Sequence, residues 1–588
     1  MPKKIKIKLN GKSVFCEAGL TVMQVAAKEG VEIPSLCEHP DFPHKANCRV
    51  CVVEVVDRKG LVTSCSTLVQ DGMVILTDTE RVQKARKINL ELLYGEHEQD
   101  CAKCVLRYNC KLLNYASKYK ASFRAFNDRK INRPTYKFAN AVEFNNSQCI
   151  DCRNCIDACS ILQGINYLEI VGKGAEQEIR PTENENIECI LCGQCAVHCP
   201  VSAAQEQADW DKVEKIISEK KQTGKIVVAQ FAPSIRVSIG EEFGMKNGAV
   251  VTEQLAEAMK LLGFDYVFDV SFSADITTMV EAEELIERIK KSFPLEGEVS
   301  RSNRRDGGVL PMLTSCCPAW VRYVEFYRPD LIPNLTTSRS PQIHCGGVIK
   351  TYWAGLTKID PKDIVVVSIM PCTAKKYEAS LEKLKINNLN PVDRVLTTRE
   401  LAFMIKKAGV DFKKLKGTPV DEPLGEHSGA GVIYGGSGGV MESALRTAQA
   451  KICGENSNLC KTRLDFMDTR GLEGIKTAEV DMGGKILKVA VVNGMNHLQE
   501  FIKDIDKYDY VEVMACPGGC IGGGGEPIPT NMEIRKKRTE ALFAIDKGKT
   551  VREAHKNPSV KNVLYWLDQQ GEKVKHSVLH TSYKKLKK

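Results

Sequence analysis

Short apolar runs alternate with helical stretches along the second half of the chain. In the stretches 253–263 and 397–409, apolar residues recur every three to four positions, as on one face of a helix. Six apolar runs have the composition of buried strands, at 225–233, 264–272, 309–317, 363–372, 487–494 and 508–516. This alternation predicts an α/β domain with largely parallel sheets.

The N-terminal part of the chain has a different pattern. Polar and apolar residues alternate in MPKKIKIKLNGKSVF, which predicts a strand, and RVQKARKINLELLYGEH (81–97) has the period of an amphipathic helix. A chain of 588 residues fits roughly three to five domains. We therefore expect smaller modules ahead of the α/β domain.

Composition narrows the class of protein. Hydrophobic residues make up 43% of the chain, and runs such as 364–370 are far shorter than the roughly 18 apolar residues of a membrane span. The basic N-terminus lacks the apolar core of a signal peptide, so we expect a cytoplasmic protein with no membrane contact. The net charge of +9 permits an acidic protein partner, and the lack of an aromatic and basic stripe predicts no nucleic-acid binding.

The chain has 24 cysteines, and tight cysteine clusters in a cytoplasmic protein indicate metal binding or catalysis, because disulfides are disfavoured there. A close pair with two distant partners suits a [2Fe–2S] centre, with zinc as the alternative, in the group Cys37, Cys48, Cys51 and Cys65. One imidazole and three thiolates could hold zinc or a cubane cluster, in the group His97, Cys101, Cys104 and Cys110.

Two repeats of the spacing C-x2-C-x2-C-x3-C follow. This is the pattern of bacterial two-cluster ferredoxins, in which the fourth cysteine of each run binds the other cluster. The pattern predicts two [4Fe–4S] sites, one at Cys149, Cys152, Cys155 and Cys199 and the other at Cys159, Cys189, Cys192 and Cys195. Beside such cubanes, iron becomes the better prediction for the first two groups as well. Thiolate-bound clusters transfer single electrons, so the four sites predict an electron wire that serves a site downstream.

Three of the predicted strands end in cysteine, in LTSCCPAW, SIMPCTAKK and VMACPGGC. Ligands of open α/β sheets bind outside the carboxyl ends of the strands, so thiols from distant positions can converge there. The expected four-thiolate site consists of Cys317, Cys372, Cys516 and Cys520. The glycines at 522–525 would let the backbone pack close to a bulky inorganic group.

These stretches resemble a known family. TSCCPAW, MPCTAKKYE and MACPGGCIGGGGEP resemble the three signature motifs of iron-only ([FeFe]) hydrogenases, and the upstream ligand series resembles the long, clostridial-type members. The resemblance implies an H-cluster, a [4Fe–4S] cubane on the four converging cysteines, joined through Cys520 to a two-iron subsite with CO, cyanide and a bridging dithiolate. It also implies the reversible conversion of two protons and two electrons to H2.

The resemblance implies roles for further residues. Cys316 would carry protons to the dithiolate, while Lys375 and Ser234 would each bind a cyanide, because buried anions need donors. Protons would travel from Cys316 through Glu284, Thr336 and Glu281 to the surface, although two glutamates three residues apart also fit a solvated helix face. Positions implied to lie near the subsite are Gln342, Met370, Tyr434 and Met514. Thr336, Tyr434 and Glu526 depart from residues that are commoner in the family.

The implied fold is multidomain, with α+β ferredoxin-like domains before an α/β H-cluster domain. We expect a β-grasp [2Fe–2S] domain at 1–79, a small His/Cys3 [4Fe–4S] domain at 80–136, a two-[4Fe–4S] domain at 137–210, and the H-cluster domain with a C-terminal helical tail at 211–588. The expected partners are ferredoxin or a similar small acidic electron carrier, and maturation proteins for the two-iron subsite.

Two alternatives remain open. One is the hydrogen-activating subunit of an NAD(P)-linked, electron-bifurcating complex, although no cysteine follows Cys520 to form the extra C-terminal cluster of the longest such subunits. The other is a sensory or assembly protein with the same fold and little turnover. The unassigned cysteines, expected to be structural, are Cys16, Cys345, Cys453 and Cys460, of which Cys345 falls closest to the expected pocket. The polar stretch 293–308 is expected to be a surface loop.

Overall fold

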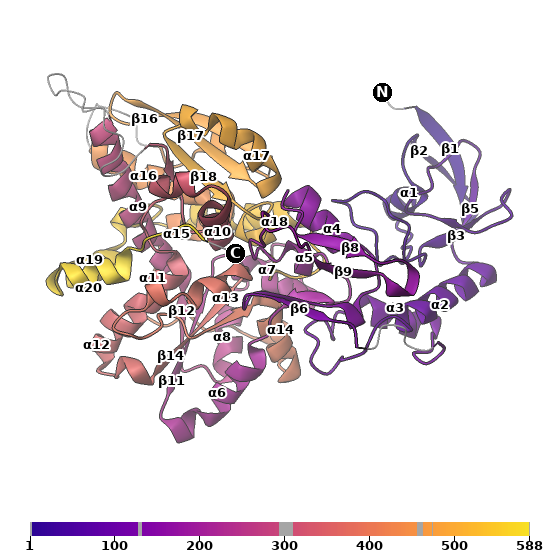
Figure 1. Cartoon of the computed structure of the whole chain (residues 1–588), viewed down its shortest axis with the longest axis horizontal. Helices are drawn as coiled ribbons and strands as arrows, with labels where there is room; N and C mark the ends of the chain where they lie inside the picture. Colours follow the sequence, from indigo (N-terminus) through magenta and orange to yellow (C-terminus); the bar gives the residue numbers. More distant parts are fainter. Residues whose placement is uncertain (1–2, 127–131, 293–309, 455–462, 473, 587–588) are drawn as a thin grey trace.

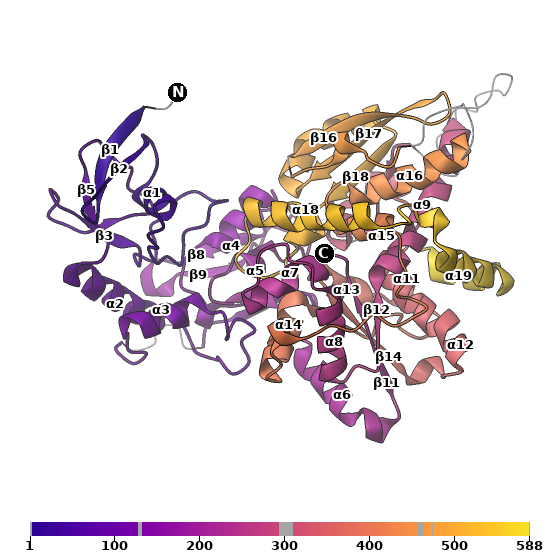
Figure 2. The ribbon, with the colours of Figure 1, turned by 180° about the vertical axis from the view of Figure 1, so that it is seen from behind.

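The computed structural model describes residues 3–126, 132–292, 310–454, 463–472 and 474–586. The expected loop at 293–308 and Cys460 lie outside these residues. The chain forms a small N-terminal lobe, a central segment and a large α/β body, and the lobe lies at one end of the long axis (Figure 1, and from behind in Figure 2). Among the helices within the described ranges, none combines the length and the apolar character needed to cross a membrane.

The N-terminal lobe is built on a five-stranded sheet in the order β2-β1-β5-β3-β4. Its first two strands form a hairpin, because both Asn10 and Gly11 have positive φ, as the tight turn between twisted strands requires. The helix α1 packs on the sheet and begins with a capping box between Thr21 and Gln24. The bounds are β1 (Lys4–Leu9), β2 (Lys12–Glu17), α1 (Val22–Lys28), β3 (Val52–Val55), β4 (Val62–Thr63) and β5 (Val74–Leu76).

The described part of the central segment contains four α-helices and two small sheets. The amphipathic helix expected at 81–97 is α2 (Glu80–Tyr94), and it packs against α3 (Lys111–Tyr119). A three-stranded sheet has the order β10-β7-β6, and β8 pairs with β9. The bounds are β6 (Thr135–Phe138), β7 (Val142–Asn145), α4 (Asn154–Asp157), β8 (Leu168–Val171), β9 (Glu178–Pro181), α5 (Gln194–Val197) and β10 (Ala204–Glu206).

The α/β body contains two four-stranded sheets. The first, in the order β12-β11-β14-β15, is entirely parallel, and in the second, β13-β18-β17-β16, only the pair of β16 and β17 is antiparallel. The largely parallel arrangement expected from the apolar runs is therefore present. The strands are β11 (Ile226–Phe231), β12 (Tyr266–Asp269), β13 (Met312–Leu313), β14 (Ile364–Met370), β15 (Arg394–Thr397), β16 (Ile475–Asp481), β17 (Ile486–Asn493) and β18 (Tyr510–Met514).

Helices cover both sheets of the body. The stretches 253–263 and 397–409 are helical as expected, in α8 and α14. The helices are α6 (Trp210–Thr223), α7 (Ile235–Ser238), α8 (Thr252–Leu262), α9 (Val270–Ser292), α10 (Pro318–Tyr327), α11 (Pro341–Val348), α12 (Ala354–Thr357), α13 (Ala374–Ala379), α14 (Thr398–Lys407), α15 (Gly429–Ile433), α16 (Gly439–Cys453), α17 (Leu498–Phe501), α18 (Met532–Gly548), α19 (Pro558–Gln569) and α20 (Glu572–Leu579).

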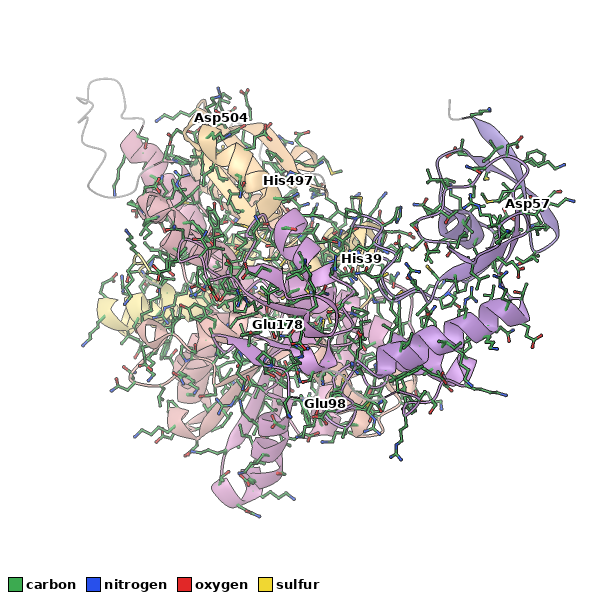
Figure 3. The ribbon with its side chains drawn as sticks, turned by 45° about the vertical axis from the view of Figure 1, so that its right-hand side comes forward. His39, Asp57, Glu98, Glu178, His497 and Asp504 are labelled. Atoms are coloured by element: carbon green, nitrogen blue, oxygen red, sulfur yellow. The ribbon has the colours of Figure 1, made fainter. Side chains whose placement is uncertain are left out.

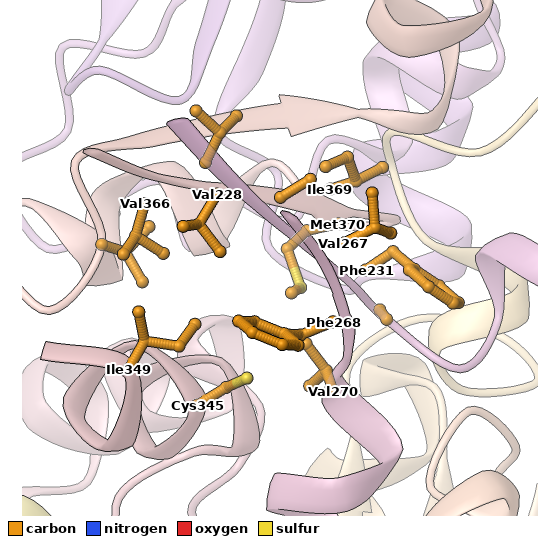
Figure 4. Close-up of a cluster of buried hydrophobic side chains, with 14 of the residues drawn as sticks. Val228, Phe231, Val267, Phe268, Val270, Cys345, Ile349, Val366, Ile369 and Met370 are labelled. Carbon is orange, nitrogen blue, oxygen red and sulfur yellow. The ribbon is translucent and has the colours of Figure 1, made fainter. Parts of the chain in front are cut away.

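Two sequence predictions need correction. The strand expected at 264–272 ends at Asp269, where the backbone turns directly into α9, and the strand expected at 309–317 is reduced to Met312–Leu313. The apolar residues that continued these patterns are buried as helix or loop instead. Figure 4 shows the core of the first sheet, where Cys345 packs among apolar side chains such as Phe268 and Ile349. The thiol of Cys345 is thus part of the apolar core, which agrees with the expectation that this cysteine is structural.

The N-terminal lobe contacts the C-terminal segment of the body directly. His39 Nε2 donates to the carbonyl oxygen of Thr530 at 2.9 Å, and Arg535 Nη2 donates to Asp41 Oδ2, also at 2.9 Å. The ring of His39 meets that of His198, from the second ferredoxin-type repeat, edge on. In Figure 3, His39 lies toward the body and Asp57 on the far side of the lobe. This junction joins three segments that are far apart in the sequence.

Candidate metal centres and active site

The four N-terminal cysteines come together in the lobe. All four are buried; Cys51 Sγ lies 3.4 Å from Cys65 Sγ, and the Cys48 amide donates to Cys37 Sγ at 3.5 Å. A hydrogen bond from the thiol of Cys37 lowers the pKa of Cys48 to about 6. Four thiols packed this closely fit either a [2Fe–2S] centre or zinc, as the sequence left open.

The second group forms at the end of α2. Burial raises the pKa of Cys104 to about 11, with a further contribution from the nearby thiols of Cys110 and Cys101. The Nδ1–H of His97 donates to the carbonyl of Gln148 at 2.7 Å, which makes Nε2 the nitrogen that can bind a metal. The structure thus brings the three thiols together and fixes the ring tautomer, and the ligand role of His97 stays a prediction.

The two ferredoxin-type repeats cross over as their spacing predicts. One cavity is lined by Cys149, Cys152, Cys155 and Cys199. A second cavity is lined by Cys159, Cys189, Cys192 and Cys195. The local geometry repeats too, because a residue with positive φ, Arg153 or Gly193, precedes each of the one-turn helices α4 and α5. Each repeat thereby gives three thiols to one cavity and its last thiol to the other.

Neighbouring sites are close enough for their thiols to influence one another. Burial is the main cause that raises the pKa of Cys110, Cys155 and Cys192. A thiol of the next site raises each pKa further: Cys199 that of Cys110, Cys195 that of Cys155, and Cys516 that of Cys192. The arrangement is therefore a continuous series from the second group, through both ferredoxin-type cavities, to the cysteines of the α/β body.

The cysteines at the strand ends converge from both sheets of the body. Cys372 follows β14 of the first sheet, whereas the other three follow β13 and β18 of the second. Burial raises the pKa of Cys516 well above its usual range, and the charges of Cys372, Cys317 and Cys520 raise it further. The pair near the C-terminus is thus completed by two thiols from elsewhere in the chain. The four-thiolate set fits a cubane, and its ligand role is a prediction carried from the sequence.

The glycine run packs against other backbone. A Cβ at Gly524 would lie 2.4 Å from the carbonyl oxygen of Cys192 and 2.5 Å from the Cα of Gly193. The structure shows that the ferredoxin-type repeat requires glycine at this position, and the expected close approach of the glycine run to an inorganic group stays a prediction. Thr373 Oγ1 reinforces the junction by donating to the carbonyl of Leu191 at 2.8 Å. The last cluster site of the series is thus fixed against the four-thiolate site.

We expect Gly524→Ala to separate these two sites. Neither atom that a methyl group would meet belongs to a flexible side chain, so overpacking should cost about 1–3 kcal/mol in stability and should slow hydrogen evolution. Gly355→Ala in α12 is a matched control, because a Cβ there meets nothing within 4 Å and alanine favours a helix. Anaerobic thermal unfolding and viologen-linked turnover measure both effects. Wild-type turnover in Gly524→Ala would contradict the assigned close approach.

A buried polar cluster lies beside the four-thiolate site. Lys375 Nζ donates to the carbonyl of Cys316 at 3.0 Å and to Glu378 Oε2 at 2.8 Å. Burial lowers the pKa of Lys375, but the carboxylate of Glu378 outweighs it, so the ammonium stays charged. Gln342 Nε2 also donates to Glu378, while its Oε1 has no hydrogen-bond partner among the described residues. A buried cation and an unsatisfied amide oxygen fit a bound group that carries polar, anionic ligands.

The other residues expected near the subsite gather around Cys316. Tyr434 and Met514 are buried and pack in one small cluster with Cys316. Met370 is buried at the end of β14. Ser234 is fully buried beside Glu526, a carboxyl whose pKa burial raises to about 7. The family resemblance implied that all four lie near the subsite, and the structure places them at or beside the strand ends that meet there.

The order of the two glutamates in the proton route is reversed relative to the expectation. Burial raises the pKa of Cys316, and Glu281 is the charge that raises it most, so Glu281 is the inner group. Glu284 is the outer one: it lines a surface cavity and accepts from Thr336 Oγ1 at 2.7 Å and from Arg288 Nη2 at 2.5 Å. The spacing put both on one helix face, but it could not say which end of α9 points inward.

Two residues of this region were missed in the sequence. Glu378 follows Lys375 by three positions on α13, a spacing that could have indicated the ion pair. Arg399 donates to the carbonyls of Gly524 and Glu526, at 2.9 and 2.6 Å, and pairs with Glu206. It thereby fixes the glycine run from the N-terminus of α14. Nothing in the local sequence signals this role, because its partners lie more than a hundred residues away.

Models of known protein families match three parts of the chain. The family model described as "Iron only hydrogenase large subunit, C-terminal domain" matches residues 225–524. A "2Fe-2S iron-sulfur cluster binding domain" matches residues 2–80, and "Iron hydrogenase small subunit" matches residues 532–586. The last match covers the expected helical tail.

Individual relatives agree with these matches. The NADP-reducing hydrogenase subunit HndD of Solidesulfovibrio fructosivorans is 37% identical, over 98% of this chain and 98% of that protein. Iron hydrogenase 1 of Clostridium pasteurianum is 37% identical, over 98% of this chain and 99% of that protein. Among solved structures, the apo [FeFe]-hydrogenase HydA1 from Chlamydomonas reinhardtii superposes with a TM-score of 0.55 at 36% identity, covering 64% of this chain and 98% of that one.

Proposed function

Since the chain belongs to the iron-only hydrogenase family, we propose that its N-terminal cysteine sites form the electron wire of a ferredoxin-linked [FeFe]-hydrogenase. The enzyme catalyses the reversible conversion of two protons and two electrons to H2 at an H-cluster. The observation that carries the proposed wire is the series of thiol groups that ends at the four-thiolate site.

The proposed cofactors are one [2Fe–2S] cluster, three accessory [4Fe–4S] clusters and the H-cluster. A matched 2Fe-2S domain favours iron over zinc in the lobe. The accessory clusters would occupy the His97 group and the two ferredoxin-type cavities. We assign the cubane of the H-cluster to Cys317, Cys372, Cys516 and Cys520. The assigned domains are those expected from the sequence, at 1–79, 80–136, 137–210 and 211–588.

The chain's own residues would bind the two-iron subsite and move its protons. When bound, that subsite would supply the iron chemistry that combines protons with electrons and a basic amine that takes up protons. Lys375 would donate to one cyanide through Nζ, and Ser234 would donate to the other through Oγ. Gln342, Met370, Tyr434 and Met514 would line the subsite and exclude bulk water.

In the proposed route, protons move from the surface to Cys316 through a series of side chains. We assign the order Glu284, Thr336, Glu281, Cys316. Glu284 would receive a proton at Oε2, to which the hydroxyl of Thr336 is already bonded at 2.7 Å. Glu281 would pass it to the thiol of Cys316. Neither oxygen of Glu281 bonds to a described residue, so a water molecule can join it to Thr336.

The proposed electron partner is ferredoxin or a similar small acidic carrier, to which the net charge of +9 is complementary. A second candidate is favoured by one comparison, because the relative HndD is named as a subunit of an NADP-reducing hydrogenase and matches the chain over its full length. In that case the chain would receive electrons from flavin-containing partner subunits. Copurification from the native cell separates the two, since only the second candidate predicts stably bound flavoprotein.

The test of the proposed function is anaerobic hydrogen evolution after the clusters and the two-iron subsite have been installed. We expect rapid evolution with reduced methyl viologen and with reduced ferredoxin, and little evolution with NADPH alone. Rapid evolution with viologen and none with ferredoxin would exclude the ferredoxin partner. Negligible evolution with a spectroscopically intact H-cluster would favour the sensory alternative.

A further inference from the structure

We propose that His580, on the C-terminal segment, takes up protons from solvent and passes them through Thr337 to Glu284, at the outer end of the relay. This inference rests on the proposed proton route through Glu284. Its basis is a chain of two hydrogen bonds: Thr337 Oγ1 lies 2.9 Å from His580 Nδ1 and 3.1 Å from Glu284 Oε2. Both His580 and Glu284 line the same surface cavity, of about 670 Å³.

The donors in this chain point in one direction. An ionised carboxylate can only accept, so the hydroxyl of Thr337 donates to Glu284 Oε2. The oxygen of that hydroxyl then accepts from Nδ1–H of His580, which fixes the neutral imidazole with hydrogen on Nδ1. Nε2 is left as an acceptor in a ring that lines the cavity. The arrangement therefore leads inward from solvent to the carboxylate.

A proton transfer along this chain of hydrogen bonds conserves the number of protons. A proton from solvent binds Nε2, the Nδ1 proton moves to Thr337 Oγ1, and the original hydroxyl proton moves to Glu284 Oε2. One proton enters and one leaves, so the imidazole and the hydroxyl stay neutral. The ring returns to its starting state by exchange with water in the cavity, when Nε2 gives its proton to one water molecule and Nδ1 takes a proton from another.

Ionisable groups surround this ring on several elements. The groups that face His580 are Glu284 and Arg288 from α9, Arg339 from the segment before α11, Glu572, Lys575 and His576 from α20, and Tyr583 beyond it. The cavity is also lined by the carboxylates of Glu283, Glu287 and Asp568. A wall with several carboxylates exchanges protons with water and increases their local concentration.

The position of His580 does not depend on its imidazole. Its carbonyl accepts from Arg339 Nε at 2.8 Å, and its backbone forms a bridge with Ser338. The next amide, of Thr581, donates to the carbonyl of Thr337 at 2.8 Å. Replacement of the ring should therefore leave the C-terminal segment in place, which makes the role of the ring testable.

The test compares H580Q and T337V with the double variant and with the control K573Q, in the holoenzyme. Glutamine can keep a bond to Thr337 but cannot shuttle protons, and valine preserves the shape of threonine without its hydroxyl. We expect each single variant to lose about ten-fold in viologen-linked hydrogen evolution, below the full range of acid–base effects because Glu284 itself lines the cavity. K573Q, on the exposed face of α20 and outside the cavity lining, should retain wild-type activity.

Three further measurements distinguish a role in proton transfer from a purely structural role. Millimolar imidazole should restore H580Q and leave T337V unchanged, the solvent isotope effect should rise in both variants, and the double variant should be no slower than either single one. Wild-type rates in H580Q, additive losses, or a lack of rescue by imidazole would overturn the proposal. These outcomes can be distinguished from a failure of the proposed function, in which the wild-type enzyme would evolve no hydrogen or Glu281 would prove dispensable.

Discussion

Cys316→Ala is expected to lower hydrogen evolution by about 10²- to 10⁴-fold, the range for loss of a positioned acid or base. The thiol of Cys316 lies beside the charge of Glu281 and within the cluster of Tyr434 and Met514, where the proposed proton route meets the four-thiolate site. Its own sulfur is not one of the four thiols assigned to the cubane. The cluster should therefore assemble normally, and its absorbance and EPR signals should match the wild type.

The matched control is Cys345→Ala. This thiol is also fully buried, but it packs in the apolar core of the first sheet (Figure 4). Its removal should cost stability through a small cavity and leave turnover unchanged. If Cys316→Ala kept substantial activity with an intact H-cluster, protons would have to reach the subsite by another route. Loss of the cubane signals in Cys316→Ala would mean that the residue binds the cluster.

The parts of the site whose geometry depends on the spacing of nearby residues were predictable from the sequence. The two C-x2-C-x2-C-x3-C repeats fix which thiol goes to which cavity, because the short helices α4 and α5 repeat the same geometry. The convergence of cysteines at strand ends also followed from general rules for parallel sheets. In these cases a few neighbouring residues determine the geometry, so no tertiary information is needed.

The parts that depend on packing between distant segments were not predictable. The order of Glu281 and Glu284 depends on which end of α9 faces the second sheet. The need for glycine at Gly524 comes from the backbone of Cys192, more than three hundred residues earlier. Two strands were also missed. The strand β15 has only four residues, Arg394–Thr397, and β16 is an edge strand, paired antiparallel with β17, that lacks a continuous apolar run. Such features have no local signal in the chain.

Glu281→Gln is expected to abolish most turnover while leaving the protein at least as stable as the wild type. The carboxyl of Glu281 is buried without a hydrogen-bond partner among the described residues, and burial, with the charges of Glu284 and Glu512, raises its pKa well above the ordinary value. A raised pKa suits a group that must hold a proton and pass it to Cys316. Glutamine keeps the shape but cannot transfer a proton, so we expect a loss of about 10²- to 10⁴-fold.

The stability of this variant should depend on pH in a defined direction. Because the folded pKa of Glu281 is raised, its contribution to stability is fully present below the unfolded value of about 4.5 and is lost as the pH rises toward the folded pKa. Glu281→Gln does not titrate, so its thermal midpoint relative to wild type should rise with pH over that window. Glu283→Gln is the control, because Glu283 lies on the same helix but its side chain is 58% exposed and pairs with Lys451. Comparable activity loss in both variants would show a general effect on α9, whereas full activity in Glu281→Gln would remove this residue from the relay.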